Sequence, residues 1–185
     1  MRLLAIVCGF TLAHCAAAQE DTLLAGTVTS VIDGDTIKVQ VPTGPIIVRL
    51  AHIDAPESYQ AHGGAAARAL HARLLAQEVS VQVVARQGED RVVALVLLGG
   101  EDINAWMVKQ GHAWTLRAAS PDASYCAWED AARSLRRGLW SAPVWVAPWD
   151  WRAARKDALF FPTDHSNAST ASCMREIRDA PTLDD

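Results

Sequence analysis

The stretch VIDGDTIKV at residues 31–39 decides the fold, because it places a tight polar turn between two runs of β-forming residues. Branched side chains are frequent in residues 23–32 before the turn, and apolar residues alternate with polar ones from 36 to 41 after it. A period of two predicts strands with one buried face, and the step Asp33-Gly34 is typical of a short hairpin turn. We therefore expect an antiparallel hairpin here.

The rest of the chain predicts more strands, with helices between them. An alanine-rich segment repeats apolar residues at four-residue spacing, as an amphipathic helix does. Pro121 and Gly138 are typical of the beginning and the end of a helix. The expected elements beyond the hairpin are strands at 46–53, 79–85, 91–98 and around 113–116, and helices at 61–77, 102–110 and 120–138. This order predicts a mixed α+β, mainly β fold: a five-stranded OB-type barrel with three helices.

Residues 1–18 have the composition of a secretion signal. Arg2 precedes an apolar run that ends at Leu12, and three alanines ending at Ala18 precede polar residues. This pattern predicts a signal peptide cleaved after Ala18, and its apolar run is too short to span a bilayer. We expect a secreted or periplasmic protein without a membrane anchor in its mature form. The alternative is a lipoprotein anchored through Cys15, although His14 stands where such sites carry a small residue.

Residues 22–152 are expected to form one domain, and residues 153–185 a polar C-terminal tail in which apolar side chains are sparse. Cleavage of the signal peptide would leave two cysteines, Cys126 and Cys173, in a chain bound for an oxidising compartment. A Cys126–Cys173 disulfide that tethers the tail to the last helix is the prediction. Two free thiols are the alternative.

The charge balance limits the kinds of partner that the chain can bind. It contains 17 Lys and Arg against 21 Asp and Glu, a formal net charge of −4. Proteins that coat nucleic acid through bulk attraction to phosphate are usually strongly basic, so this class is excluded. Part of the acidic excess lies in the tail, outside the predicted domain. A local cluster of arginines or a metal site remains compatible with this composition.

Acidic residues and arginines gather where predicted strands begin or end. They are Asp33, Asp35, Arg49, Asp54, Glu57 and Arg91. Carboxylates surrounded by oxygen donors suit a hard cation such as Ca²⁺, and two arginines suit a phosphate group whose charge grows in a transition state. The turn acids could instead serve only the hairpin, and Arg49 could form a structural ion pair with Glu57 or Asp54.

Tryptophans and basic residues are concentrated in the second half of the chain. All seven tryptophans lie between Trp106 and Trp151. Core packing and a C-terminal strap over the barrel are favoured over a stacking platform for bases or sugars. Near the end of the domain, a basic cluster could either guide phosphate backbones or solvate a helix face. This cluster consists of Arg133, Arg136, Arg137, Arg152, Arg155 and Lys156.

Several segments, taken in order, resemble the staphylococcal nuclease (thermonuclease) family. They are VIDGDTIKV at 31–39, VRLAHIDAPES at 48–58, ALVLLGGEDINAWMVKQGHAW at 94–114, GLW at 138–140 and PWDWR at 148–152. The ordered combination is much more specific than any one of them. The resemblance implies the barrel fold, nuclease activity on DNA, RNA or both, and a secreted bacterial member of the family.

The resemblance also implies roles for individual residues. The family's calcium ligands match the carboxylates of Asp35 and Asp54 and the backbone carbonyl of Ala55, and its catalytic residues match Arg49, Glu57 and Arg91. The implied reaction is Ca²⁺-assisted hydrolysis of a phosphodiester to a 3′-phosphate product. Glu57 would activate or orient the attacking water, and the two arginines would stabilise the pentacoordinate phosphorane.

The chain departs from the family pattern at two places. The segment before Arg91 is shorter than the family's loop, and the two tyrosines that hold the nucleotide are replaced by Arg117 and Ala119. An OB-fold module that binds single strands without cutting them is the main alternative, and a tryptophan-lined carbohydrate binder is another. We expect a monomeric enzyme with Ca²⁺ as cofactor and nucleic acid as substrate.

Overall fold

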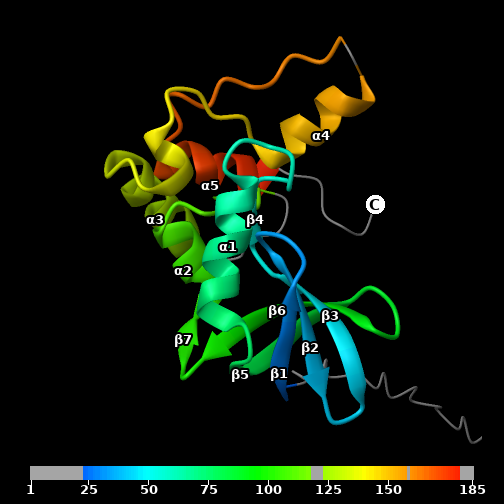
Figure 1. Cartoon of the computed structure of the whole chain (residues 1–185). Helices are drawn as coiled ribbons and strands as arrows, with labels where there is room; N and C mark the ends of the chain where they lie inside the picture. Colours follow the sequence, from blue (N-terminus) through cyan, green and yellow to red (C-terminus); the bar gives the residue numbers. More distant parts are fainter. Residues whose placement is uncertain (1–22, 118–122, 158, 180–185) are drawn as a thin grey trace, which may run out of the picture.

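The computed structural model describes residues 23–117, 123–157 and 159–179, which form a β-barrel with helices around one side (Figure 1). The strands are β1 (Leu23–Val31), β2 (Thr36–Val41), β3 (Gly44–Leu50), β4 (Ile53–Asp54), β5 (Glu78–Arg86), β6 (Arg91–Leu98), β7 (Glu101–Asp102) and β8 (Trp114–Thr115). The predicted signal peptide lies outside the described residues. Within them, no helix is both long and apolar enough to cross a lipid bilayer.

The predicted hairpin is confirmed. β1 and β2 pair antiparallel, with Val28 opposite Val39 and Val31 opposite Ile37. Between them, the side chain of Asp33 accepts a hydrogen bond of 3.0 Å from the backbone N–H of Asp35. This contact of an acidic side chain with the backbone two residues later is a common way to stabilise a turn.

Five strands close the barrel as predicted. The sheet order is β3-β2-β1-β5-β6-β7, and an additional parallel pairing of β3 with β6 joins the two sides. Register shifts in β1 and β5 mark bulges, which bend strands so that a sheet can close. The interior is filled by branched aliphatic side chains such as Ile37, Val39 and Val48, all with no exposed surface.

The prediction of three helices was wrong, because the described residues alone form five α-helices. They are α1 (Gly63–Leu74), α2 (Ile103–Lys109), α3 (Ala123–Ser134), α4 (Pro148–Lys156) and α5 (Thr170–Asp179), with a 3₁₀ turn at Gly138–Ser141. α4 begins with Pro148 at a first helical position, which is a favourable place for proline. α5 lies in the segment predicted as a polar tail, where few apolar residues indicate a packed helix.

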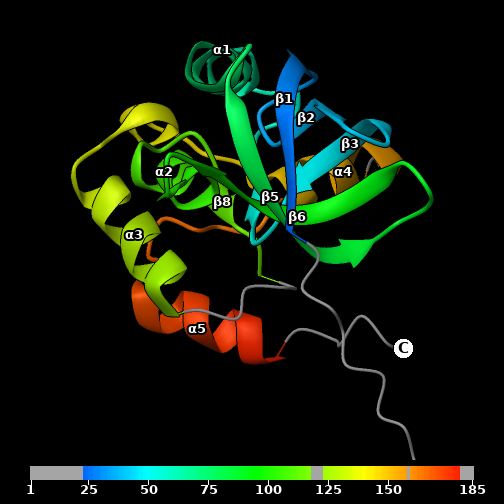
Figure 2. The same cartoon turned by 90° about the horizontal axis from the view of Figure 1, so that it is seen from below.

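Covalent and polar contacts hold α5 against α3, and the two helices lie side by side in Figure 2. A disulfide joins Cys126 of α3 to Cys173 of α5, as predicted. The hydroxyl of Thr170 donates a 2.8 Å hydrogen bond to Asp130. Because these contacts replace a wide apolar face, the hydrophobic pattern of the sequence does not predict this helix.

The tryptophans mainly fill a second, smaller core beside the barrel. Trp114 and Trp140 are fully buried and their rings meet edge to face, 4.6 Å apart between centroids. Trp145 and Trp149 pack against this cluster. The favoured prediction of core packing is therefore confirmed for these residues.

Candidate active site

A close approach of three segments places the first acidic residue. A Cβ atom at Gly34 would lie 2.6 Å from the Cβ of Ala55 and 2.9 Å from that of Ala66, so only glycine fits in this turn. The turn is thereby pressed against the end of β4 and against α1. The carboxylate of Asp35 accepts a 2.9 Å hydrogen bond from the backbone N–H of Ala55, which joins the β1–β2 turn to β4.

Arg49 joins the two buried carboxylates. It lies on β3 between Val48 and Leu50, which point into the core, so its side chain lies on the opposite face of the strand. Its Nη2 atom is 3.3 Å from Oδ2 of Asp35 and 3.0 Å from Oδ1 of Asp54. Both carboxylates therefore face one point at the mouth of the barrel.

Burial changes the acidity of Asp35. Asp35 is 4% exposed and Asp54 is 1% exposed. Burial raises the pKa of Asp35 to about 7, although the positive charge of Arg49 acts in the opposite direction. Burial therefore outweighs the charge of Arg49 at Asp35, and the protonated form of this carboxyl is favoured more than in a free aspartate.

Glu57 is held beside this pair by its own backbone. Its N–H donates a 3.1 Å hydrogen bond to the side chain of Gln60, which in turn donates to the carbonyl of Val146. A Cβ at Gly63, the first residue of α1, would lie 1.9 Å from the carbonyl oxygen of Glu57. The start of α1 and the tryptophan-rich segment thus fix the position of this loop.

Arg152 on α4 connects Glu57 to Asp54. Its Nη1 donates hydrogen bonds of 2.8 Å to Glu57 and 3.1 Å to Asp54, and its Nη2 donates one of 2.7 Å to Asp54. Hydrogen bonding to Asp54 raises the pKa of Arg152 above its ordinary value, so the guanidinium stays charged. Sequence reasoning placed Arg152 only in a general basic cluster. The PWDWR segment was the available signal, but nothing local to it indicates a contact with residues near position 54.

Arg91 is the predicted residue that the structure does not join to the others. It begins β6, is exposed, and pairs in register with Ile47 on β3, whereas Arg49 pairs with Val93. Arg91 and Arg49 therefore lie on the same face of neighbouring strands, offset by two residues or about 6–7 Å along the strand. Within the described residues, no hydrogen bond or ion pair joins Arg91 to the carboxylates of Asp35, Asp54 or Glu57.

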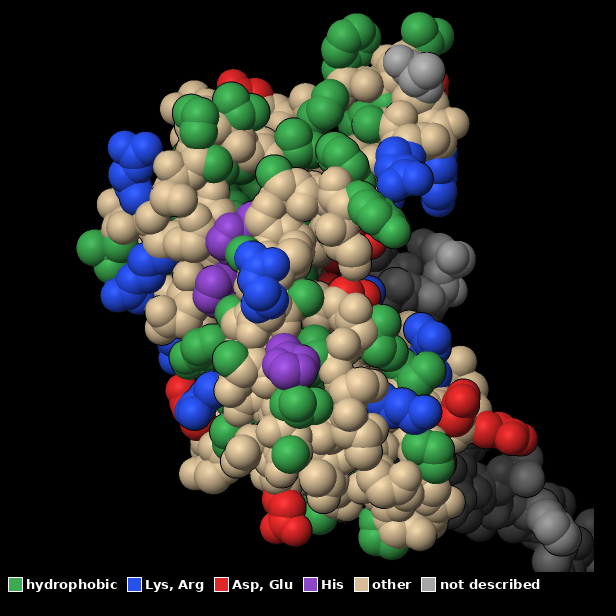
Figure 3. All heavy atoms as spheres, in the orientation of Figure 1, with side chains coloured by type: hydrophobic (Ala, Val, Ile, Leu, Met, Phe, Trp, Pro, Cys, Tyr) green, Lys and Arg blue, Asp and Glu red, His purple; other side chains and the backbone are tan. Residues whose placement is uncertain are grey.

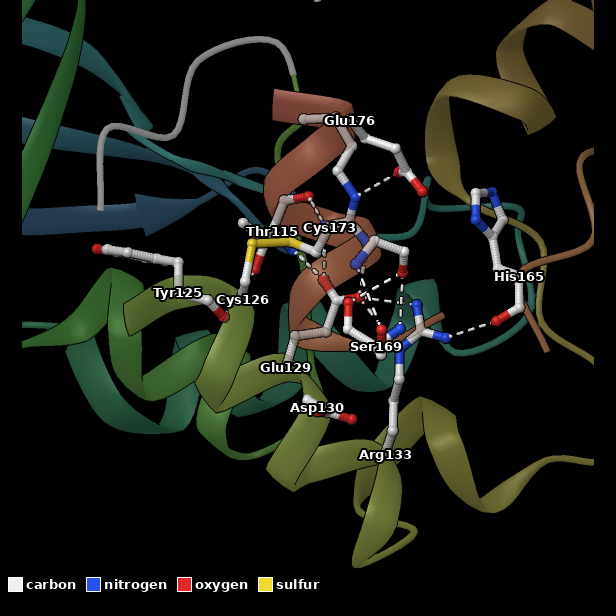
Figure 4. A network of polar contacts seen from close by, with 12 residues as sticks. Thr115, Tyr125, Cys126, Glu129, Asp130, Arg133, His165, Ser169, Cys173 and Glu176 are labelled. Atoms are coloured by element: carbon white, nitrogen blue, oxygen red, sulfur yellow. Dashed lines mark hydrogen bonds and ion pairs between the residues drawn. A yellow bond between two sulfur atoms is a disulfide. The ribbon is translucent and has the colours of Figure 1, made fainter. Parts of the chain in front are cut away.

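Arg117, at a position where the family resemblance leads one to expect a nucleotide-holding tyrosine, is paired with two glutamates instead. It is 8% exposed and makes two hydrogen bonds of 2.9 and 2.8 Å to Glu129, and a third of 2.9 Å to Glu176. Figure 4 shows this network around Glu129, with Arg133 also pointing toward it. Burial would raise the pKa of Glu129, but the two arginines hold it below its ordinary value. Ala119 lies outside the described residues.

The predicted basic cluster does not form one surface. Arg133 lies over the ring of Trp140, 4.0 Å from its centroid, and is paired with Glu129. Arg137 donates to the carbonyl of Lys109 at the end of α2. Only the α4 part of the cluster, Arg152, Arg155 and Lys156, lines a cavity next to Glu57.

The donor set at the mouth of the barrel fits a hard divalent cation. Among the described residues, no group of three or more His, Cys, Asp and Glu side chains could hold a metal ion by itself. Ca²⁺ also accepts backbone carbonyl and water oxygens, so the two converging carboxylates and the carbonyl of Ala55 could form part of its shell.

Comparison with known proteins agrees with this fold. A family profile described as "Staphylococcal nuclease homologue" matches residues 47–142. The chain is 44% identical over 144 residues to a micrococcal nuclease of Shigella flexneri, covering 72% of this chain and 83% of that protein. It is 39% identical over 140 residues to the protein ParB of Escherichia coli, covering 70% and 79%.

A third relative is an uncharacterized endonuclease of Escherichia coli, 34% identical over 128 residues, which are 69% of this chain and 84% of the relative. The matched range contains the positions of Arg49, Asp54, Glu57 and Arg91, whereas Asp35 lies outside it. The chain belongs to the staphylococcal nuclease family.

Proposed function

We propose that this chain is a Ca²⁺-dependent nuclease that hydrolyses phosphodiester bonds of DNA, RNA or both and leaves 3′-phosphate ends. One observation carries the proposal: the carboxylates of Asp35 and Asp54 both contact Arg49, and the guanidinium of Arg152 links Asp54 to Glu57. This reaction needs acidic groups that bind a cation, a solvent-accessible arginine that binds the phosphate, and a further carboxylate that contacts the attacking water.

The metal would be held by the carboxylates of Asp35 and Asp54 and by the backbone carbonyl of Ala55. When bound, Ca²⁺ would supply neutralisation of negative charge on the phosphate oxygens. The two aspartates are buried and held by hydrogen bonds from the backbone of Ala55 and from Arg49. Arg152 also occupies both oxygens of Asp54, so it would have to move away for a cation to bind there.

Glu57 is the residue suited to orient or deprotonate the attacking water. Its side chain is 40% exposed, so water can reach it, whereas Asp54 at 1% is inaccessible. Arg152 donates a 2.8 Å hydrogen bond to this carboxylate and so orients it, and a carboxylate can accept a proton from water. The loop contacts of Glu57 with Gln60 and Gly63 hold it in place.

The arginines are suited to charge stabilisation. Arginine is protonated at all physiological pH values, so Arg49 cannot serve as a general acid of ordinary strength. The side chain of Arg49 is 34% exposed at the mouth of the barrel and can contact a phosphate while it remains paired with Asp54. Arg91 extends the same face on β6 and would approach the phosphate from the neighbouring strand.

We also propose that the protein acts after export from the cytoplasm. Residues 1–18 have the composition of a cleaved signal peptide. The Cys126–Cys173 disulfide supports this location, because such bonds persist mainly in oxidising compartments.

The alternative, a module that binds single strands without cutting them, has one observation in its favour. Arg152 caps both Asp54 and Glu57, and a permanent ion pair there would leave the site inactive. Cleavage assays separate the two functions, because only a nuclease converts its ligand to products.

The test is digestion of plasmid DNA and of a structured RNA by the purified mature chain. We expect cleavage with Ca²⁺, arrest by EDTA and recovery with excess Ca²⁺. The products should carry 3′-phosphates, which block terminal transferase until a phosphatase removes them. Binding of either substrate without cleavage in Ca²⁺ would contradict the nuclease and favour the binding module.

A further inference from the structure

A second feature of the site is a cavity between the Glu57 loop and α4. It has a volume of about 490 Å³ and is lined by Glu57, Tyr59, Trp151, Arg152, Arg155 and Lys156, among others. Figure 3 shows this side of the molecule hollowed below α4, with blue basic side chains above the hollow and red acidic ones at its inner end. The cavity therefore opens next to the carboxylate that is proposed to activate water.

The charges of this lining are not balanced within the protein. Arg152 forms ion pairs with Asp54 and Glu57, whereas Arg155 and Lys156 are exposed and form none with other described residues. Arg155 and Lys156 are thus two uncompensated cations at this cavity, in a chain with an overall formal charge of −4. A local excess of positive charge in an acidic protein attracts an anion to this place.

An aromatic side chain is left exposed at the same cavity. Tyr59 is 88% exposed, two residues after Glu57. Water contacts nearly all of its ring, so it adds little to the stability of the fold. An exposed aromatic ring beside uncompensated cations is the combination with which proteins hold unpaired bases and their phosphates.

We propose that this cavity is a subsite for a single-stranded stretch of the substrate, in which Tyr59 stacks on a base and Arg155 and Lys156 bind the backbone phosphates. The inference rests on the proposed nuclease function and adds the strand state of the substrate to it. Arg117, buried against Glu129, cannot contribute to holding a nucleotide. α4 and the Glu57 loop supply the contacts instead.

A binding assay tests the stacking contact. Anisotropy of a fluorescein-labelled single strand of about ten nucleotides would be measured with Ca²⁺ in a Glu57→Gln background, where chemistry is blocked. Tyr59→Ala should weaken binding at least about 5-fold, and Tyr59→Phe should stay within about twofold, because stacking needs the ring and not the hydroxyl. The same strand in a blunt duplex should lose nothing on Tyr59→Ala. Equal losses for duplex and single strand, or no loss for either, would overturn the stacking role.

The salt dependence tests the two cations. Replacing Arg155 and Lys156 together by Gln should reduce the slope of log affinity against log salt by about 1.4, the value for two phosphate contacts on a single strand. The matched control is Arg175→Gln with Arg178→Gln on α5, two exposed cations outside the cavity, which should leave the slope unchanged. An unchanged slope in the α4 variant would overturn the phosphate contacts.

Kinetics of the otherwise wild-type enzyme separate this inference from the function itself. Tyr59→Ala should raise KM for single strands and change kcat by less than about threefold, since its contact is to bound substrate rather than to the reacting phosphate. If the wild-type chain cleaves and Tyr59→Ala has the same KM, the subsite is wrong and the nuclease stands. If the wild-type chain does not cleave, the nuclease is wrong, and the binding assay on that chain still decides the subsite.

Discussion

Arg152 and Asp54 are joined by two hydrogen bonds, of 3.1 Å from Nη1 and 2.7 Å from Nη2, although 98 residues separate them in the chain. The same Nη1 donates a third hydrogen bond to Glu57. Asp54 accepts from Arg49 as well, so two guanidinium groups share this buried carboxylate. α4 therefore supplies a tethered cation at the place where we propose that Ca²⁺ binds.

Removal of this tethered cation should change the affinity for calcium. In Arg152→Gln, Asp54 loses a competing positive charge, so Ca²⁺ should bind about 2- to 5-fold more tightly, the size of a partly exposed ion pair. Isothermal titration of the mature protein without substrate measures this directly. The control is Arg155→Gln on the same helix, which forms no ion pair with Asp54 and should bind Ca²⁺ like the wild type. Unchanged or weaker affinity in Arg152→Gln would show that Arg152 does not compete with the metal.

Two adjacent glycines provide a matched test of how α1 positions Glu57. A methyl group at Gly63 would collide with the carbonyl of Glu57, whereas one at Gly64 would meet only the flexible end of Arg68, 3.3 Å away. Gly63→Ala should lower kcat by about tenfold or more, because small misplacements of catalytic groups are costly. Gly64→Ala should keep kcat and add up to about 1 kcal/mol of stability, as alanine favours helices. Equal activity of the two variants would contradict this role of Gly63.

A histidine pair should make the stability of the fold depend on pH. His62 Nε2 and His112 Nδ1 are 3.0 Å apart, and burial, followed by the charge of His62, lowers the pKa of His112 to about 4. The unfolded chain takes up a proton near the ordinary histidine pKa of about 6.5, while the folded chain does not until about pH 4. Stability from this group is therefore complete above pH 6.5 and is lost as the pH falls toward 4.

The comparison of melting temperatures at pH 7 and pH 5 tests this dependence. The wild type should lose more stability over this interval than His112→Gln, which keeps a polar side chain but cannot titrate. Parallel losses in the two proteins would show that His112 titrates normally in the folded state.

The disulfide should account for much of the stability of the C-terminal part. The bond between Cys126 and Cys173 closes a loop with a sequence separation of 47. Replacing both cysteines by serine should lower the free energy of unfolding by about 2–4 kcal/mol, the usual range for such a loop. Denaturant unfolding with and without reductant measures it, since reduction of the wild type should reproduce the loss. Insensitivity to both changes would argue that α5 contributes nothing to the fold.

Regular periodicity explains which parts of the fold are predictable from the sequence. The strands around the Asp33 turn alternate apolar and polar residues because one face is buried in the barrel, and they were predicted almost to the residue. α5 was not, because Cys173 is its one buried residue and its contacts with α3 are polar or covalent. Such contacts depend on which segments lie side by side in the folded protein, and the spacing of apolar residues along the sequence does not indicate this.

The residues of the candidate site also fall into those that the sequence predicts and those that it does not. Asp35, Arg49 and Asp54 follow directly from strand ends in the barrel, so their convergence could be anticipated. Arg152 could not, because its place depends on how the tryptophan-rich segment packs after the barrel is complete. Arg91 lies on the expected strand and face. Its distance from Arg49 depends on the register between β3 and β6, which cannot be predicted from the sequence.

The central claim is that Glu57, held beside the Asp35–Asp54 pair, carries out hydrolysis. The most direct measurement is the single-turnover cleavage rate of a single-stranded oligonucleotide at saturating Ca²⁺, for wild type and Glu57→Gln, with melting temperature and Ca²⁺ affinity measured on both. We predict that Glu57→Gln keeps its fold and binds Ca²⁺ but cleaves about 10²- to 10⁴-fold more slowly, as expected for loss of a general base. A folded Glu57→Gln variant that cleaves at the wild-type rate would contradict the account.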